Sequence, residues 1–341
     1  MSTYAAAGVD IEAGDRAVQL MKSKVAMSRR PEVVDDPSGF AGLFDVSALR
    51  GYTRPLMATS TDGVGTKVMI AQALGKHDTI GQDLVGMVVD DLVVCGAEPL
   101  FMTDYIACGK VVPERIADIV GGVAEGCRLA GCALVGGETA EHPGALGPDE
   151  YDLAGAGTGV VEADALLGPE RVRAGDVVLA LASSGVHSNG YSLVRHIVKA
   201  AGLTLEQEIP ELGRTLGEEL LEPTRIYSSD CVALTRAHEV HAYAHITGGG
   251  LTANLARSLP AGLDAVLDRS SWTPQPIFGV LAGRGGVAQA DMDQTFNLGV
   301  GMCAVVPPAS VDPALELLAE RGVPAWVLGE IVPGEGRASY G

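Results

Sequence analysis

The chain has 341 residues, with 24 basic and 43 acidic side chains and a formal net charge of −19. A chain this acidic repels phosphate backbones at long range, and the aromatic residues needed for base stacking make up only 4% of it, so we expect no nucleic-acid partner. No apolar run reaches the roughly 18 residues of a membrane-spanning helix, and the first residues lack the basic and apolar regions of an export signal. These features predict a cytoplasmic protein with no membrane partner.

Glycine is unusually frequent, with 45 residues against a usual share of roughly 7%. Four short glycine clusters stand at the ends of apolar runs, at residues 62–67, 136–139, 155–159 and 247–250. Ordinary turns would explain any one of these clusters. Four in one chain favour loops whose backbone N–H groups approach a bound anion.

In chain order, the first fifty residues look loosely ordered. Within them, residues 36–45 contain two phenylalanines and two glycines, a composition typical either of a flap that closes over a ligand or of a packed surface loop. Periodicity and turn residues then predict a series of regular elements. These are a strand at 55–61, helices at 66–75 and 79–95, a strand at 99–106, a helix at 113–130, and strands at 132–136 and 153–161.

The second half repeats the alternation of strand and helix after a stretch at 167–176 that contains glycine and proline. The predicted elements are a strand at 177–182, helices at 191–201, 225–238 and 250–258, strands at 264–267 and 299–306, a helix at 311–320 and a strand at 325–332. This pattern predicts an α/β fold with α+β-like features in two domains, residues 1–168 and 169–341.

The segment Asp62-Gly-Val-Gly-Thr-Lys67 follows the first predicted strand. Its carboxylate is suited to Mg²⁺, while Lys67 and the loop amides are suited to phosphate. The segment matches neither the Walker A pattern nor the dinucleotide-binding G-x-G-x-x-G pattern. It therefore suggests an uncommon kind of nucleotide-phosphate loop.

Three carboxylates lie on the predicted helix 79–95. A solvated helix face accounts for Asp83 and Asp90. Asp91 points nearer the apolar stripe of the helix, where an unpaired carboxylate is costly to bury. We therefore favour metal binding for Asp91.

Two later loops also carry polar side chains. Residues 136–144 place Glu138 in a tight turn, without a second histidine at the spacing that a zinc site needs. Residues 183–190 bring hydroxyl, imidazole and amide groups to a helix N-terminus, where Ser188 or Asn189 is the expected cap. His187 is suited to orient or protonate a substrate group, and the G-x-S-x-G elbow of a hydrolase is absent.

These segments form an ordered series: AGVDI (7–11), DGVGTK (62–67), DLVVxGAEPLF (91–101), GGETAExPG (136–144), SSGxHSNGYSLVR (183–195), PTRIY (223–227), HxTGGG (245–250) and TFNxGVGM (295–302). The series resembles the phosphoribosylformylglycinamidine cyclo-ligase family, also called AIR synthetases. The resemblance implies an ATP- and Mg²⁺-dependent ligase of de novo purine biosynthesis that converts formylglycinamidine ribonucleotide to aminoimidazole ribonucleotide. It also implies a homodimer in which the N-terminal domains pair.

The resemblance also assigns roles to individual residues. The ATP phosphates and Mg²⁺ would contact Asp62, Gly63, Gly65, Thr66 and Lys67, with Asp91 completing the metal site and Gly137, Glu138 and Thr139 lining the same cleft. The substrate would contact His187, Ser188, Asn189, Thr247, Gly248, Gly249 and Gly250. The implied catalytic residues are Lys67, His187 and Asn189, and Lys67→Ala is expected to lower turnover at least tenfold with the fold intact.

The sequence departs from the family pattern at a few positions. Asp90 stands where we expect Asn, Gln294 where we expect Arg, and Pro37-Ser38-Gly39-Phe40 where we expect a double glycine. Other functions remain as alternatives. A selenophosphate-synthase-like enzyme should have a reactive cysteine near the N-terminus, but the first is Cys95, and a carbamoyl-dehydratase-type hydrogenase-maturation protein should end in Cys. Thiamine-monophosphate kinases lack two of the segments, and a catalytically silent nucleotide-binding scaffold would not need Asp62, Lys67, Asp91 and His187.

Overall fold

The computed structural model describes residues 11–341, which divide into two compact units. Unit 1 continues to Leu92 and resumes over Glu98–Ala163, while unit 2 comprises Val93–Ala97 and Asp164–Gly341. This division falls five residues before the boundary predicted at 168/169. It also assigns residues 93–97 to unit 2, because Val93 belongs to a hydrophobic core of that unit. Most of the AGVDI segment lies outside the described residues.

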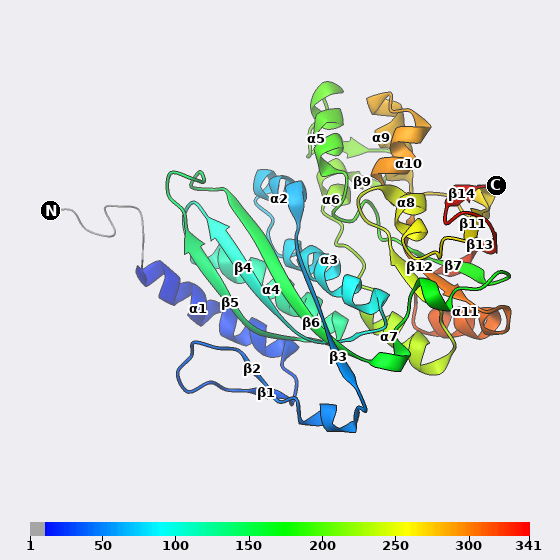
Figure 1. Cartoon of the computed structure of the whole chain (residues 1–341). Coiled ribbons are helices and arrows are strands. Elements are labelled where there is room, and N and C mark those ends of the chain that lie inside the picture. The colour runs from blue at the N-terminus through cyan, green and yellow to red at the C-terminus, as the bar shows by residue number, and fades with distance from the viewer. Residues whose placement is uncertain (1–10) are drawn as a thin grey trace. The chain divides into compact units, whose positions relative to one another are not determined.

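Unit 1 contains a four-stranded sheet in the order β3-β6-β4-β5 (Figure 1). Its strands are β3 (Pro55–Gly63), β4 (Glu98–Cys108), β5 (Ala133–Glu141) and β6 (Tyr151–Glu162). β6 pairs antiparallel with both β3 and β4, whereas β4 and β5 are parallel. The parallel pair is joined by α4 (Pro113–Ala130), which begins with a proline and ends before Gly131 at φ +74°. The sequence predicted both ends of this helix correctly.

α3 (Ile80–Val94) packs against the middle of this sheet. The alternating glycines of β6 make this possible, because a Cβ on Gly155 would meet Leu84 of α3 at 3.3 Å and one on Gly157 would meet Val88 at 2.9 Å. The glycines of β6 therefore serve helix packing. α2 (Val68–Leu74) precedes α3, and a hairpin of β1 (Val33–Val34) and β2 (Leu43–Phe44) precedes the sheet.

α1 (Ile11–Val25) was missed by the sequence analysis, which treated this region as loosely ordered. It lies beside α4, along the side of the sheet that β5 forms (Figure 1). Its apolar positions 17, 21 and 25 are spaced by four residues, but only Ala17 is fully buried. The apolar stripe is narrow, which explains why its periodicity gave a weak signal.

Unit 2 contains a six-stranded sheet in the order β10-β12-β7-β13-β11-β14. Its strands are β7 (Val177–Ala182), β10 (Ala242–His245), β11 (Leu263–Leu267), β12 (Val300–Val306), β13 (Ala325–Pro333) and β14 (Ala338–Tyr340). All neighbouring pairs are antiparallel except β11 and β14. Both large sheets are therefore mostly antiparallel, so the α+β-like description fits better than a doubly wound α/β sheet.

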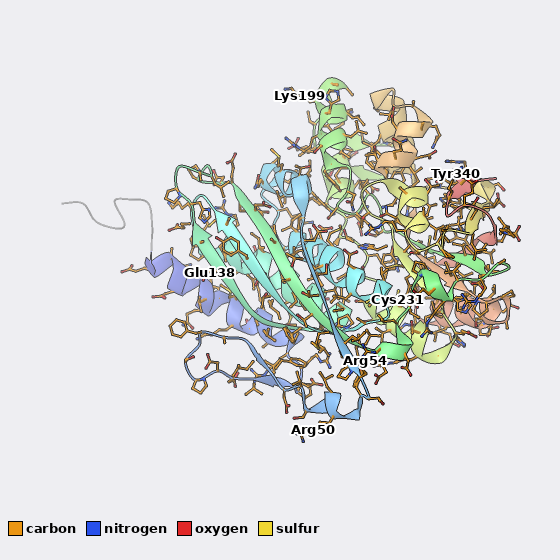
Figure 2. The ribbon with its side chains drawn as sticks, in the orientation of Figure 1. Arg50, Arg54, Glu138, Lys199, Cys231 and Tyr340 are labelled. Carbon is orange, nitrogen blue, oxygen red and sulfur yellow. The ribbon has the colours of Figure 1, made fainter. Side chains whose placement is uncertain are left out.

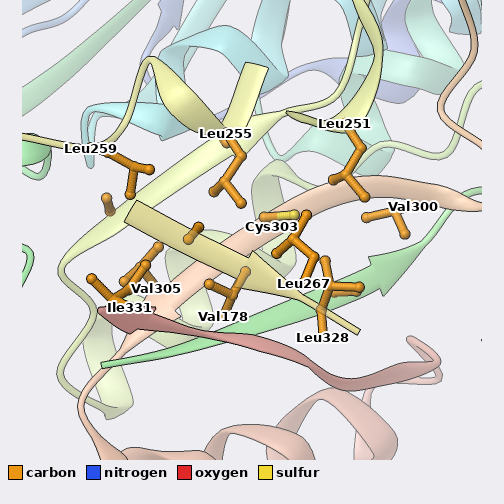
Figure 3. Close-up of a cluster of buried hydrophobic side chains, with 14 of the residues drawn as sticks. Val178, Leu251, Leu255, Leu259, Leu267, Val300, Cys303, Val305, Leu328 and Ile331 are labelled. Carbon is orange, nitrogen blue, oxygen red and sulfur yellow. The ribbon is translucent and has the colours of Figure 1, made fainter. Parts of the chain in front are cut away.

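Hydrophobic residues cover both faces of the unit 2 sheet. On one face, Leu251 and Leu255 of α8 (Gly250–Ala256) pack onto residues such as Val178, Cys303 and Leu328 (Figure 3). On the other face, α7 (Ser228–Ala237) and α11 (Val311–Glu320) cover the sheet. The remaining elements of unit 2 are α5 (Tyr191–Ala200), α6 (Leu216–Leu220), α9 (Pro276–Gly285), α10 (Gln289–Thr295), β8 (Glu208–Ile209) and β9 (Arg214–Thr215). Of these, the sequence predicted only α5. It also missed β10 and β14 in the sheet.

No helix in residues 11–341 combines the length and the apolar character needed to cross a membrane.

Candidate functional site

The DGVGTK segment turns the end of β3 into a short 3₁₀ helix, Gly65–Lys67. Asp62 accepts a hydrogen bond from the Gly63 N–H at 2.7 Å, which orients its carboxylate. Lys67 is fully buried, and its ammonium group donates to the Asp83 carboxylate of α3 at 2.8 Å. Lys67 therefore joins this loop to α3. Its burial contradicts the expectation that Lys67→Ala would leave the fold intact, because that change removes the ammonium partner of a buried carboxylate.

The burial of the α3 carboxylates is the reverse of the sequence prediction. Asp83 and Asp90 are fully buried, and Asp91 is exposed. The reason is that α3 packs against β6 and also closely against α4, where a Cβ on Gly126 would meet the Val85 side chain at 2.8 Å. The helix therefore has almost no solvated face.

Four positions form one row across the sheet of unit 1. Asp62 on β3 and Asp104 on β4 both pair with Gly155 on β6, and Asp104 also pairs with Gly137 on β5. Paired residues point to the same face, so Asp62 and Asp104 share the face that α3 covers. Two strand spacings, about 10 Å, separate them. The sequence analysis did not single out Asp104.

A cavity of about 640 Å³ lies in unit 1 between α1, α4 and β5. Its size falls in the range of small-molecule sites. Three predicted residues line it, Gly137, Glu138 and Thr139, and Glu138 lies on β5 (Figure 2). The other lining residues are Gly14, Asp15, Ala17, Val18, Met21, Lys22, Val25, Asp104, Val111, Val120, Leu134, Val135, Gly136 and Glu141. The cavity thus has mainly apolar walls and a few polar groups.

Asp104 is the most perturbed carboxyl group of this cavity. Its side chain is 8% exposed, and burial raises the pKa of Asp104 to about 7. Within residues 11–341, no other side chain donates a hydrogen bond to its carboxyl group. The only sequence signal for this site was indirect. Gly137 is a glycine because a Cβ there would overlap Asp104 Oδ1.

In unit 2, three loops meet around Asn297. The Asn297 amide donates to the carbonyls of Gly185 at 2.9 Å and Val186 at 3.3 Å, and its oxygen accepts from the Ser183 hydroxyl at 3.1 Å. Asn297 therefore ties the loop after β7 to the segment before β12. The sequence analysis quoted Asn297 only as part of the resembling TFNxGVGM segment.

The glycine-rich loop 247–250 has a side-chain support of its own. The Asn254 amide donates to the carbonyls of Thr247, Gly248 and Gly250 at distances of 2.8–3.3 Å. The Asn189 side chain lies beside this loop, since its Oδ1 is 3.6 Å from where a Gly248 Cβ would stand. The structure therefore places Asn189 of the predicted 187–189 group beside the predicted loop 247–250. The sequence analysis missed Asn254, because nothing in the sequence shows which amide faces a loop.

His187 and the start of α5 differ from expectation in detail. The residue that caps α5 is Gly190, with no side-chain cap, so the prediction of Ser188 or Asn189 as cap was wrong. His187 is 1% exposed and has φ +64°, an uncommon conformation for a residue with a side chain. Its Nε2 accepts a hydrogen bond from the Ser184 N–H at 3.1 Å, which requires this nitrogen to be unprotonated. The ring thus holds the loop in shape.

In residues 11–341, no three histidine, cysteine, aspartate or glutamate side chains gather as a metal-binding group. Mg²⁺ is commonly held by one or two carboxylates together with substrate phosphates and waters. The half-buried Asp62 and the exposed Asp91 are donors of the right chemistry for such a shared site.

Sequence comparisons match both units. The N-terminal domain model of the AIR synthase related proteins matches residues 45–161, and the C-terminal domain model matches residues 173–340. A phosphoribosylformylglycinamidine cyclo-ligase of Geobacillus kaustophilus is 52% identical over 98% of this chain and 96% of its own length. One from Shouchella clausii is 51% identical over 98% of this chain and 97% of its own length.

Solved structures show the same fold at lower identity. Thiamine-monophosphate kinase from Stenotrophomonas maltophilia has a TM-score of 0.66 and 18% identity, covering 95% of both chains. The hydrogenase maturation protein HypE of E. coli has a TM-score of 0.65 and 18% identity, covering 95% of this chain and 92% of its own. HypE in complex with ATP has a TM-score of 0.64, 18% identity, and covers 95% of this chain and 90% of its own.

Proposed function

Because the chain belongs to the phosphoribosylformylglycinamidine cyclo-ligase family, we infer that it closes the imidazole ring of aminoimidazole ribonucleotide in purine biosynthesis, in an ATP-dependent reaction. The observation that carries this function is identity of about half of all residues over nearly the full length of the chain. In the reaction, ATP phosphorylates the formamide oxygen of formylglycinamidine ribonucleotide. The amidine nitrogen then attacks the activated carbon, and phosphate leaves. The protein must position the two reactants and offset the charge of the phosphoryl group.

We propose that unit 1 binds ATP and Mg²⁺. The residues are those of the 62–67 loop, with Asp62 and Asp91 as carboxylate ligands of the ion and Gly137, Glu138 and Thr139 at the cavity beneath α1. Two observations support this proposal. The Gly63 N–H orients the Asp62 carboxylate, and the cavity is large enough for part of a nucleotide. When bound, Mg²⁺ would neutralise phosphate charge, which this acidic chain cannot do with its few cations. Lys67 then fixes the 62–67 loop to α3 through its ion pair with Asp83. Because its side chain is fully buried, it can contact the ATP phosphates only if the loop moves.

We propose that unit 2 contacts formylglycinamidine ribonucleotide through Ser188, Asn189 and the loop 247–250. The N–H groups at the start of α5 are suited to a phosphate group, and Asn189 is half-buried beside Gly248. The catalytic role predicted for His187 becomes one of positioning, since its Nε2 is engaged by Ser184.

We also propose a homodimer formed through the open face of the unit 1 sheet. Outward-pointing residues of this face include large hydrophobic side chains, Met57 at 53% and Tyr105 at 41% exposure. Exposed apolar area on a sheet face marks an interaction surface. Light scattering should give twice the chain mass for the wild type and for Met27→Glu, a control at a 48%-exposed residue before β1. Met57→Glu should give the monomer mass, and a dimeric Met57→Glu would contradict this interface.

The activity is tested by incubating the protein with Mg²⁺, ATP and formylglycinamidine ribonucleotide in vitro and following aminoimidazole ribonucleotide by mass spectrometry. One ADP should form for each product molecule. ATP hydrolysis without ring closure, or ring closure without ATP, would refute the proposal. For the localisation, we propose the cytoplasm, where a purine-pathway ligase finds ATP.

A further inference from the structure

The starting observation is a buried carboxyl group that faces a cavity. Asp104 lines the 640 Å³ cavity beneath α1, is 8% exposed, and receives no hydrogen bond from another side chain within residues 11–341. The carboxyl group accepts a hydrogen bond from the backbone N–H of Asp104 itself, and its remaining hydrogen-bonding capacity is available to a ligand in the cavity.

We propose that Asp104 is a ligand-recognition residue that binds the N=C–NH₂ unit carried by both reactants of the proposed reaction. In ATP this unit is N1, C6 and the amino group of adenine, and in formylglycinamidine ribonucleotide it is the amidine. A carboxyl group presents two oxygens side by side, which fit two neighbouring nitrogens of such a unit. The proposal rests on the proposed function, because that function supplies the two ligands.

The cavity walls suit the flat part of such a ligand. Ala17 and Val25 of α1, Val120 of α4 and Leu134 of β5 contribute apolar lining. Burying apolar surface there would supply affinity, and Asp104 would supply orientation. The position of the carboxyl group also depends on Gly137. Asp104 Oδ1 occupies the space that a side chain at residue 137 would fill.

The surrounding charges allow both protonation states of this carboxyl group. The charged residues that line the cavity in the described chain are Asp15 and Lys22 on α1 and Glu138 and Glu141 on β5, and the Cys127 thiol of α4 also interacts with Asp104. Burial raises the pKa of Asp104 to about 7. The neutral acid can donate to N1 of adenine and accept from its amino group. The ionised form can instead accept two hydrogen bonds from a protonated amidine.

The adenine arm of the test compares ATP with purine riboside triphosphate, which carries a hydrogen in place of the amino group. Calorimetry in the absence of the ribonucleotide substrate measures both affinities without turnover. The wild type should bind ATP at least tenfold more tightly than purine riboside triphosphate. Asp104→Asn should keep this preference, because an amide offers the same donor and acceptor as the neutral acid. Asp104→Leu should lose the preference and weaken ATP binding as well.

The amidine arm measures binding of formylglycinamidine ribonucleotide without ATP. If the amidine is the partner, Asp104→Asn should weaken this binding at least tenfold, because an amide cannot pair with a cation, and the preference for ATP should remain. Asp152→Asn is the matched control, since Asp152 is exposed on β6 and is not part of the cavity lining. It should leave both affinities unchanged.

An Asp104→Leu variant that keeps both the ATP preference and the affinity for the ribonucleotide would overturn the proposal. Circular dichroism must first show that the variant is folded, and Asp104→Asn repeats the ribonucleotide comparison with a second side chain. If the proposed function itself is wrong, the experiment shows this differently, because the wild type then forms no aminoimidazole ribonucleotide. The ATP arm can still be interpreted in that case, because it needs no turnover.

Discussion

The buried ion pair between Lys67 and Asp83 gives the sharpest stability prediction. Both side chains are fully buried, and the ammonium nitrogen lies 2.8 Å from the carboxylate oxygen. Replacing Lys67 by Met keeps most of the aliphatic stem and removes the cation. Removing one partner of a buried ion pair typically costs about 3–5 kcal/mol, because the other charge stays buried without compensation.

The measurement is a double-mutant cycle on Lys67→Met, Asp83→Leu and the double variant. At about 2–4 °C per kcal/mol for a domain of 150–250 residues, each single change should lower the unfolding temperature of unit 1 by roughly 6–20 °C. The double variant removes both charges together, so it should recover most of this loss. A Lys67→Met protein within about 0.5 kcal/mol of the wild type, or a double variant no better than the sum of the single ones, would refute the reasoning.

The same variants separate structure from catalysis. If Lys67 acts only by holding the 62–67 loop against α3, the refolded double variant should retain turnover within a few-fold. If Lys67 contacts the ATP phosphates in a closed state, turnover should stay at least tenfold below the wild type, about 1.4 kcal/mol in transition-state free energy, although stability has recovered.

Three further predictions concern the two loop regions and the cavity. Gly137→Ala should displace the Asp104 carboxyl group and weaken ATP binding at least tenfold in calorimetry, whereas Gly51→Ala should bind normally because Gly51 does not line the cavity and a Cβ there would meet nothing within 4 Å. Asn297→Ala should cost about 2–4 kcal/mol in thermal unfolding, since it leaves buried acceptors unpaired, and Asn297→Leu that unfolds like the wild type would contradict this. Because the pKa of Asp104 is raised from 3.8 to about 7 by folding, the folded state binds more protons than the unfolded state between these values. The Asp104 carboxyl group therefore contributes to the free energy of unfolding below pH 4, and this contribution is lost as the pH rises to about 7. The free energy of unfolding should fall by on the order of 4 kcal/mol over this range. Asp104→Asn should lack this slope when unfolding is measured from pH 4 to 8, and an identical slope in both proteins would exclude the effect.

The sequence predicted most elements that have strong periodicity or clear ends. α4 and α11 begin and end at the predicted residues, because proline, glycine and apolar spacing mark them. α1 was missed because, among residues 12–25, Ala17 is the one fully buried residue, so the apolar stripe is narrow. Asn189 lies beside Gly248, two residues that the family resemblance, and no local pattern, had assigned to one substrate site.

The environment of each carboxylate was not predictable from local sequence. Asp83, Asp90 and Asp91 share one helix, and their burial depends on what packs against that helix from elsewhere in the chain. Asp104 was overlooked for the same reason, since its position opposite Gly137 depends on the register of two strands. Pairing across a sheet is a long-range property, and helix periodicity carries no information about it.

The glycines of this chain have at least two structural roles, close packing of helices and the shape of loops. Gly157 and Gly126 are small because α3 lies against β6 and α4 at those points, and a Cβ there would come within 2.9 Å of a valine side chain. Such close packing removes the solvated face of α3, and the buried Asp83 then requires a buried cation, which Lys67 provides. The loop 247–250 differs, because its Gly248 makes no close packing contact. The Asn254 amide donates to the carbonyls of Gly248 and Gly250, and Asn189 lies beside Gly248. Replacing a packing glycine should therefore affect stability first, whereas replacing a loop glycine should affect ligand binding first. The contrast between Gly126→Ala and Gly248→Ala, compared by thermal unfolding and by ribonucleotide affinity, tests this division directly.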